Sequence, residues 1–211
     1  MYIPKHFASD DEKLALGIVQ DNPFALLLTM PDAPGDVPDI THLPMLWVSD
    51  GEGRGKIIGH VAKANAHHHR FDGKAASVAI FAGPHAYISP NYYASPALVP
   101  TWNYAAVHLH GVIRAITDDA GAIAILDTLV SAFENDNTGN WSTDRLPEGL
   151  LERQIKGIVA FEMPVDRVET KVKMSQNRTA DDIAGAMDAL SKSAFQDDQK
   201  TAEMMRTLNK S

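Results

Sequence analysis

The sequence contains no cysteine, and this absence excludes disulfide bonds and thiol chemistry. It also has no uninterrupted apolar run of about 18 residues, the length that a membrane-spanning helix requires. The first residues lack the basic and apolar pattern of a secretion signal and soon become acidic. We therefore expect a globular protein with no membrane segment, and a cytoplasmic location.

Positive charge is scarce as well. The chain has 19 Lys and Arg against 27 Asp and Glu, which gives a net charge of −8. A duplex-DNA binder usually shows a basic face or a recognition module. The densest basic stretch, with Arg167, Lys171, Lys173 and Arg178, suits one phosphate group or a solvated strand face better than a length of DNA backbone. Direct DNA binding by this chain is therefore not expected.

Several catalytic and cofactor motifs are missing. No G-x-G-x-x-G follows the first predicted strand, and no G-x-S-x-G occurs. His108 and His110 share a strand face, but the sequence does not identify a third metal ligand. The adjacent histidines at 67–69 would point in different directions on a helix, so they cannot share one metal. We predict neither a metal site nor a catalytic side chain.

Apolar patterning and turn residues predict a mainly β fold. Strands are expected at 24–30, 40–49, 56–62, 75–82, 85–89, 104–116 and 157–175. The run 24–30 reads as buried on both faces, Pro44 marks an edge or a bulge, and Gly83-Pro84 separates two strands. Short turns between consecutive strands favour an antiparallel barrel over a parallel sheet.

Helices are predicted at the ends and in the connections. Ser9 opens a capping box before a helix that reaches about Gln20, and Asp118 or Asp119 caps a helix over 120–135. A short helix is expected within 146–155, and Ser175 reads as the N-cap of the helix that follows it. A polar helix forms the tail. No linker is evident, so we predict one domain over 1–211 with a helical segment at 176–211.

The segment from Gly83 to Tyr104, GPHAYISPNYYASPALVPTWNY, is rich in proline, tyrosine and tryptophan. Trp102 offers a flat ring beside the hydrogen-bonding side chains of Thr101 and Asn103, which suits a planar heteroaromatic ligand. Gly59 would allow a ligand to approach the backbone closely. The alternative is structural, with Trp102 as a core anchor.

The segment KMSQNR adds groups that suit an anion. Lys173 and Arg178 supply positive charge, Ser175, Gln176 and Asn177 supply donors, and a serine before a helix leaves free backbone N–H groups. A planar ring joined to a phosphate is the profile of flavin mononucleotide (FMN). In the alternative, structural reading, Ser175 is a plain helix cap.

Several motifs together resemble a known family. The stretches HLPMLW, GHVAKANAHHHRF, GPHAYISPNYY, VPTWNYAAVHLHG and KVKMSQNR are similar to those of the PaiB-type FMN-binding negative transcriptional regulators. The resemblance implies a split β-barrel, an antiparallel Greek-key barrel shared with pyridoxine-phosphate oxidases and flavin reductases. It also implies FMN at the interface of a homodimer.

Carried over by position, the resemblance assigns cofactor contacts. Strand residues Thr41, His42 and Leu43 would meet the isoalloxazine ring, and His60, Val61, Ala62 and Asn65 would lie beside the ring and ribityl chain. Trp102 and Asn103 would close the pocket, with the proline-stiffened aromatic segment as a lid or wall. The phosphate or the ring edge would meet Lys173, Ser175, Gln176 and Arg178.

Three functions stay open on the sequence. The first is a dimeric FMN-binding regulator or sensor. The second is a flavin-dependent oxidoreductase that uses FMN with a nicotinamide donor, with the chemistry carried by the cofactor. The third is a haem-binding or haem-degrading protein on the same barrel, since histidine is plentiful.

Overall fold

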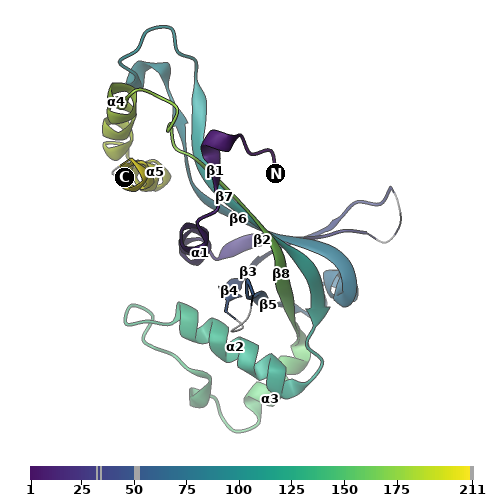
Figure 1. The fold of residues 1–211 in the computed structure, drawn as a ribbon. Helices are drawn as coiled ribbons and strands as arrows, with labels where there is room; N and C mark the ends of the chain where they lie inside the picture. The colour runs from purple at the N-terminus through teal and green to yellow at the C-terminus, as the bar shows by residue number, and fades with distance from the viewer. Residues whose placement is uncertain (32, 34, 50–52, 210–211) are drawn as a thin grey trace. The chain divides into compact units, whose positions relative to one another are not determined.

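The computed structural model describes residues 1–31, 33, 35–49 and 53–209. The chain forms two compact units: unit 1 comprises Met1–Asp21, Ala82–His108 and Glu169–Ser211, and unit 2 comprises Asn22–Phe81 and Leu109–Val168. Three long strands, β6 (Asp72–Ile88), β7 (Thr101–Ala115) and β8 (Ile158–Lys173), continue from one unit into the other (Figure 1). The single domain expected over 1–211 stays a prediction.

The other strands are β1 (Ala8–Ser9), β2 (Phe24–Thr29), β3 (Asp39–Pro44), β4 (Leu46–Val48) and β5 (Lys56–Ala62). The strands pair in the order β3-β2-β6-β7-β8-β5-β4, and β1 adds to β8. The registers of β1 with β8, β2 with β3, β2 with β6, β4 with β5 and β5 with β8 are all antiparallel. The mainly antiparallel β architecture predicted from the sequence is thus confirmed. The connections between consecutive strands differ in length: residues 30–38 separate β2 from β3, whereas residues 116–157 separate β7 from β8.

Unit 2 contains β2 (Phe24–Thr29), β3 (Asp39–Pro44), β4 (Leu46–Val48) and β5 (Lys56–Ala62). The prediction that the 24–30 run is buried on both faces was wrong. Burial alternates along β2: Ala25, Leu27 and Thr29 are buried, whereas Leu26 and Leu28 are half-buried. An antiparallel strand can leave one face less covered, and the continuous apolar run concealed this.

The predicted strand at 40–49 is two strands, because the chain breaks at Met45. The Met45 side chain is fully buried, and its N–H donates to the Pro23 carbonyl oxygen at 2.9 Å. β3 ends at Pro44 and stands at one end of the sheet order. The edge position inferred from this proline is confirmed, since an edge strand tolerates the missing N–H.

The core of unit 2 explains Gly59 without a ligand. A Cβ on Gly59 would lie 2.8 Å from Cζ of Phe161, whose side chain is fully buried. The glycine therefore makes room for a ring of the core, and the close approach of a ligand there stays a prediction. Phe161 packs against Phe71 with 5.1 Å between ring centroids.

Helix α2 (Asp119–Phe133) covers part of the sheet of unit 2 and runs beside β4 and β5 (Figure 1). Asp118 caps it as predicted: its side chain accepts the N–H of Gly121 at 2.8 Å. Ala122, Ile125 and Leu129 pack on Ile58 and Ala160. The unit also holds α3 (Leu150–Gln154) and the 3-10 turns η2 (Ala66–Arg70), η4 (Thr143–Arg145) and η5 (Ile155–Gly157).

Unit 1 contains η1 (Lys5–Phe7), β1 (Ala8–Ser9), α1 (Glu12–Asp21), η3 (Pro90–Tyr92), α4 (Ala180–Ser191) and α5 (Gln196–Leu208). The cap of α1 was wrongly assigned to Ser9. Asp11 accepts the N–H groups of Lys13 and Leu14 at 2.9 and 3.2 Å, while Ser9 accepts only the N–H of Asp11. The predicted tail helix is α5, where Met205 is fully buried.

The predicted break at Gly83-Pro84 was also wrong, because β6 continues through both residues. β2 pairs with β6 only as far as Ile80, so Pro84 lies where β6 has a partner on one side. A missing N–H costs no ladder hydrogen bond on an unpaired side. Across the part of the chain that the structure describes, no helix is both long and apolar enough to span a membrane.

Candidate functional site

Unit 1 gathers three cations, Lys171 and Lys173 at the end of β8 and Arg178 in the following turn, which we call the basic cluster. The Lys173 ammonium donates to the Thr101 hydroxyl and to the Trp102 carbonyl oxygen at the start of β7. These two bonds fix the half-buried lysine beside the tryptophan. In the sequence, all three cations lie in a basic stretch that suits one phosphate group, and Lys173 and Arg178 were carried forward as cofactor contacts.

Aromatic rings accompany the other two cations. Lys171 is buried, with 7% of its surface exposed, and its ammonium donates to the Tyr2 carbonyl oxygen at 3.0 Å. It lies 5.0 Å from the ring centroid of Tyr104, and the Arg178 guanidinium lies 5.5 Å from that of Tyr93. Ring faces attract cations without neutralising them. The positive charge of the cluster therefore persists.

No carboxylate among residues 1–31, 33, 35–49 and 53–209 forms an ion pair with Lys171, Lys173 or Arg178. The pKa of Lys173 is held below its ordinary value, first by burial and then by the positive charges of Lys171 and Arg178. An anion bound here would reverse these unfavourable effects, and phosphate offers several strong acceptor oxygens. The cluster thus has the charge and donors to hold a phosphate group.

Ser175 does not cap a helix, so that prediction was wrong. Helix α4 begins five residues later and is capped by Thr179, whose hydroxyl accepts the N–H of Asp182 at 3.3 Å. Ser175 has φ +65° and is buried against Asn103, whose amide donates to its hydroxyl at 3.0 Å. The Asn103 side chain is fully buried and also contacts Met205 Sδ at 3.4 Å. Both polar groups therefore fix the backbone next to Lys173.

The Gln176 side chain also hydrogen-bonds within the protein, to the backbone of Met174 and Val172. Its side-chain oxygen accepts the N–H of Met174 at 2.7 Å, and its amide nitrogen donates to the Val172 carbonyl oxygen at 2.6 Å. These bonds close the turn between β8 and the segment that carries Arg178. Of the four residues predicted to meet the phosphate, Lys173 and Arg178 carry the charge, while Ser175 and Gln176 shape the turn.

Trp102, near the end of the aromatic segment, lies at the surface of unit 1 beside Tyr87 and His85. The Trp102 side chain is 52% exposed, and its ring centroid lies 6.0 Å from that of Tyr87 and 6.2 Å from that of His85. The exposed ring contradicts the alternative that Trp102 is a core anchor. A groove of about 400 Å³ opens here, lined by His85, Tyr87, Tyr92, Trp102, Phe195, Asp197 and Asp198.

In unit 2, Thr41, Asn65 and His67 form one hydrogen-bond network. The Asn65 amide donates to the Thr41 hydroxyl at 3.1 Å, and that hydroxyl lies 2.8 Å from Nδ1 of His67. The Asn65 side-chain oxygen accepts the N–H of His67 at 3.0 Å. The structure thus brings Thr41 and Asn65 together as predicted residues. His67 was not assigned to this network from the sequence. The signal was available, because three adjacent histidines in a turn point in different directions and one of them, His67, is buried.

The remaining predicted residues of unit 2 differ in exposure. Leu43 and Val61 are buried and pack in the core, whereas His42 and Ala62 are exposed. The His42 ring stacks on Phe24 with a centroid distance of 6.3 Å. Leu43 and Val61 can therefore offer a ligand their backbone groups only, while His42 and Ala62 present side chains to solvent.

His60 holds a polar atom that lacks a partner. Among the described residues, neither Nδ1 of His60 nor Nε2 of His67 has a hydrogen-bond partner, although both atoms are buried. Burial lowers the pKa of both imidazoles and so favours their neutral forms. Unpaired buried imidazole nitrogens are costly, and a hydrogen-bonding ligand would relieve that cost.

The strand pair His108 and His110 has protein partners in each unit. In unit 1, Nδ1 of His108 lies 3.9 Å from a carboxylate oxygen of Glu169, which also accepts the N-terminal ammonium at 2.9 Å. In unit 2, the Arg167 guanidinium lies 3.1 Å from Nδ1 of His110.

The fold defines a class, the split β-barrel proteins. Solved structures show the fold: the FAD and heme binding protein from Mycobacterium smegmatis matches with a TM-score of 0.62 and 18% identity, over 84% of this chain and 78% of that one. The flavocytochrome Anf3 from Azotobacter vinelandii matches with a TM-score of 0.61 and 17% identity, over 82% and 72%. The split β-barrel predicted from the sequence is thus confirmed.

Within that class the chain belongs to the family described as "Putative FMN-binding domain", whose model matches residues 1–167. It is 34% identical over 207 residues to the protease synthase and sporulation protein PAI 2 of Bacillus subtilis, covering 97% of this chain and 96% of the relative. An uncharacterized protein of Aspergillus fumigatus is 25% identical over 238 residues, with 91% of each chain covered. The resemblance to PaiB-type proteins is confirmed, and FMN is the cofactor that this family assigns to the chain.

Proposed function

We propose that the protein binds FMN with the phosphate at the basic cluster of unit 1. One observation carries the proposal: Lys171, Lys173 and Arg178 lie near one another with no carboxylate partner among the described residues. The exposed ring of Trp102, whose carbonyl oxygen accepts a hydrogen bond from Lys173, offers a stacking surface next to the cluster. Bound FMN would supply redox chemistry, and these side chains would bind and orient it.

The predicted ring contacts in unit 2 form a second candidate position for the flavin ring, proposed for that unit by itself. Thr41 and Asn65 present a hydroxyl and an amide, and the buried Nδ1 of His60 needs a partner. Such groups suit the polar edge of an isoalloxazine ring. In this proposal they orient the ring, and the backbone of His42 and Leu43 adds contacts.

The regulatory role and the homodimer are also part of the proposal. A chain with a net charge of −8 is a poor partner for DNA phosphates, so it would regulate through another protein and with FMN as the sensed ligand. Light scattering of the protein with and without FMN would show whether two copies associate. A monomer in both conditions would contradict the dimer.

Paired titrations with FMN and riboflavin test the phosphate site, since riboflavin lacks the phosphate. Each charge-assisted hydrogen bond to an anion is worth about 1.5–3 kcal/mol, so Lys173→Gln should weaken FMN binding by about 10- to 150-fold. Riboflavin binding should stay unchanged. Flavin fluorescence quenching measures both constants, and Lys192→Gln, which removes an exposed cation of unit 1, is the matched control.

Equal losses for FMN and riboflavin would mean that Lys173 supports the fold rather than the phosphate. Unchanged FMN binding would show that the phosphate does not bind at the basic cluster.

Trp102→Ala tests the contact with the flavin ring. The affinities for FMN and riboflavin should fall together, because stacking does not involve the phosphate. The visible spectrum of the protein mixed with FMN or with haemin separates the two cofactors, since haem gives a Soret band and flavin does not.

A further inference from the structure

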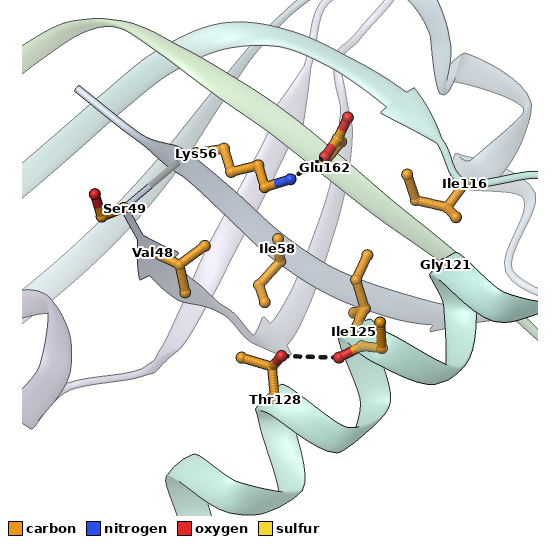
Figure 2. Close-up of a pocket in the computed structure, with 10 residues that line it drawn as sticks. Val48, Ser49, Lys56, Ile58, Ile116, Gly121, Ile125, Thr128 and Glu162 are labelled. Carbon is orange, nitrogen blue, oxygen red and sulfur yellow. Dashed lines mark hydrogen bonds and ion pairs between the residues drawn. The ribbon is translucent and has the colours of Figure 1, made fainter. Parts of the chain in front are cut away.

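A second groove, of about 410 Å³, lies in unit 2 between α2 and the strands β4, β5 and β8 (Figure 2). This volume is within the range of about 300–1,000 Å³ that small-molecule sites occupy. None of the residues assigned to FMN lines it. Its lining consists of Val48, Ser49, Lys56, Ile58, Ile116, Gly121, Ala124, Ile125, Thr128 and Glu162.

Hydrocarbon forms most of the groove wall. Ile58 and Ile125 belong to the buried cluster under α2, and the half-buried Val48 and Ile116 pack against the same cluster. Thr128 adds little polarity, because its hydroxyl donates to the Ala124 carbonyl oxygen at 2.8 Å. A ligand in this groove would therefore bury an apolar body.

The polar end of the groove carries excess positive charge. Figure 2 shows the Lys56 ammonium directed at Glu162, and the Nζ–Oε2 distance is 2.6 Å. Arg114 donates to the other oxygen of the same carboxylate, with Nε at 2.7 Å from Oε1. Two cations share one carboxylate, so the three groups together carry one net positive charge.

Lys56 has donor capacity left for a ligand. Its ammonium has three N–H groups, and Glu162 is its one hydrogen-bond acceptor within the described residues. Its side chain is 35% exposed, so an incoming group can reach it without displacing the protein. The Glu162 side chain is only 9% exposed and is engaged on both oxygens, which holds Lys56 at the rim of the groove.

We propose that this groove binds an organic carboxylate with an apolar body. The carboxylate would pair with Lys56, and the body would lie along Ile58, Ile116 and Ile125. Charge complementarity selects an anion over an amine, and the hydrocarbon wall selects an amphiphile over a free inorganic ion. The site is separate from the proposed FMN site, so either can fail without the other.

Octanoate and its uncharged counterpart 1-octanol are the probes. Ligand-observed NMR titration of the full chain should show octanoate binding in the millimolar range or tighter. Lys56→Gln should weaken octanoate about tenfold or more and leave 1-octanol unchanged, because only the carboxylate uses the ammonium.

A filling variant gives a second, independent test. Ala124 is an exposed residue of α2 that lines the groove, so Ala124→Phe should block both probes. Ala132→Phe, an exposed position of the same helix outside the groove, is the matched control and should bind both probes normally. FMN affinity should be equal in all these variants.

The proposal is overturned if octanoate fails to bind at millimolar concentration. It is overturned equally if Ala124→Phe leaves octanoate binding unchanged, since the ligand would then lie elsewhere. Equal weakening of octanoate and 1-octanol by Lys56→Gln would also refute the carboxylate assignment. Circular dichroism of each variant shows whether it is folded. If Ala124→Phe is misfolded, the comparison of octanoate and 1-octanol binding by Lys56→Gln decides the proposal.

Discussion

Glu162 accepts hydrogen bonds from two cations of unit 2, Lys56 and Arg114, and its replacement by glutamine tests the electrostatics of the sheet. One oxygen accepts from Lys56 at 2.6 Å and the other from Arg114 at 2.7 Å. Its side chain is 9% exposed, whereas those of Lys56 and Arg114 are 35% and 59% exposed. Glu162→Gln keeps the shape and removes the charge.

The expected cost lies between two limits. Exposed ion pairs contribute about 0.2–1 kcal/mol each, whereas breaking a buried pair costs about 3–5 kcal/mol. Glu162 is buried but its partners can hydrate, so we expect Glu162→Gln to lower the free energy of unfolding by about 2 kcal/mol near pH 7.

The pH dependence identifies the cause of that loss. Burial raises the pKa of Glu162, but the hydrogen bonds and charges of Lys56 and Arg114 lower it more, and the net pKa is below the ordinary 4.5. The stabilisation is therefore present above that ordinary value and is lost as the pH falls through the lower pKa of the folded state. Wild type and variant should converge in acid.

Urea unfolding of both proteins, followed by circular dichroism at a series of pH values from neutral to about pH 3, checks this prediction. Glu152→Gln, at an exposed position of α3, is the control and should stay within about 0.5 kcal/mol of wild type. A difference that persists undiminished in acid would refute the reasoning, because packing rather than charge would then explain it.

Two further predictions concern packing and loop anchoring. Gly59→Ala places a Cβ 2.8 Å from the Phe161 ring, so it should cost about 1–3 kcal/mol in denaturant unfolding, and adding Phe161→Leu should recover part of that cost. Asp182 accepts the N–H and the hydroxyl of Ser95, each at 2.8 Å, so Asp182→Asn should speed proteolysis within the aromatic segment. The Ser95 N–H bond chiefly lowers the pKa of Asp182, so this anchoring is present above the ordinary value of 3.8 and is lost as the pH falls through the lower folded pKa. Equal proteolysis rates for wild type and variant at neutral pH would contradict this anchoring role.

The fold was largely predictable because its signals are local. Alternating side chains and turn residues located β5, β7 and β8, and the Asp118 cap located α2. The wrongly predicted strand break at Gly83-Pro84 arose because contacts between residues distant in the sequence decide the structure there. Gly83-Pro84 reads as a break in isolation, but Pro84 lies beyond the β2 ladder, and a Cβ on Gly83 would be 3.0 Å from Cβ of Ala105. Neither fact is visible in the segment itself.

The site was less predictable, since its arrangement depends on distant partners. Ser175 resembled a helix cap because a serine before an apolar pattern usually is one. Its actual partner is Asn103, 72 residues away in the sequence, and the cap moves to Thr179. Lys171 and Lys173 lie in one basic stretch of the sequence, but the contacts of Lys171 with Tyr2 and Tyr104 depend on the tertiary fold. The assigned flavin contacts stay predictions.

The overall acidity of the chain strengthens the argument from the basic cluster. With 27 acidic residues against 19 basic ones, a cation placed without functional constraint would readily find a carboxylate. Two other cations of unit 1 do so: Lys192 pairs with Asp188 at 2.6 Å, and Arg206 pairs with Glu203. Lys171 instead contacts a carbonyl oxygen and a ring, and Lys173 contacts a hydroxyl and a carbonyl oxygen while burial lowers its pKa. Such an arrangement costs stability without an anion and gains it when one binds, which is how a ligand site differs from a structural ion pair.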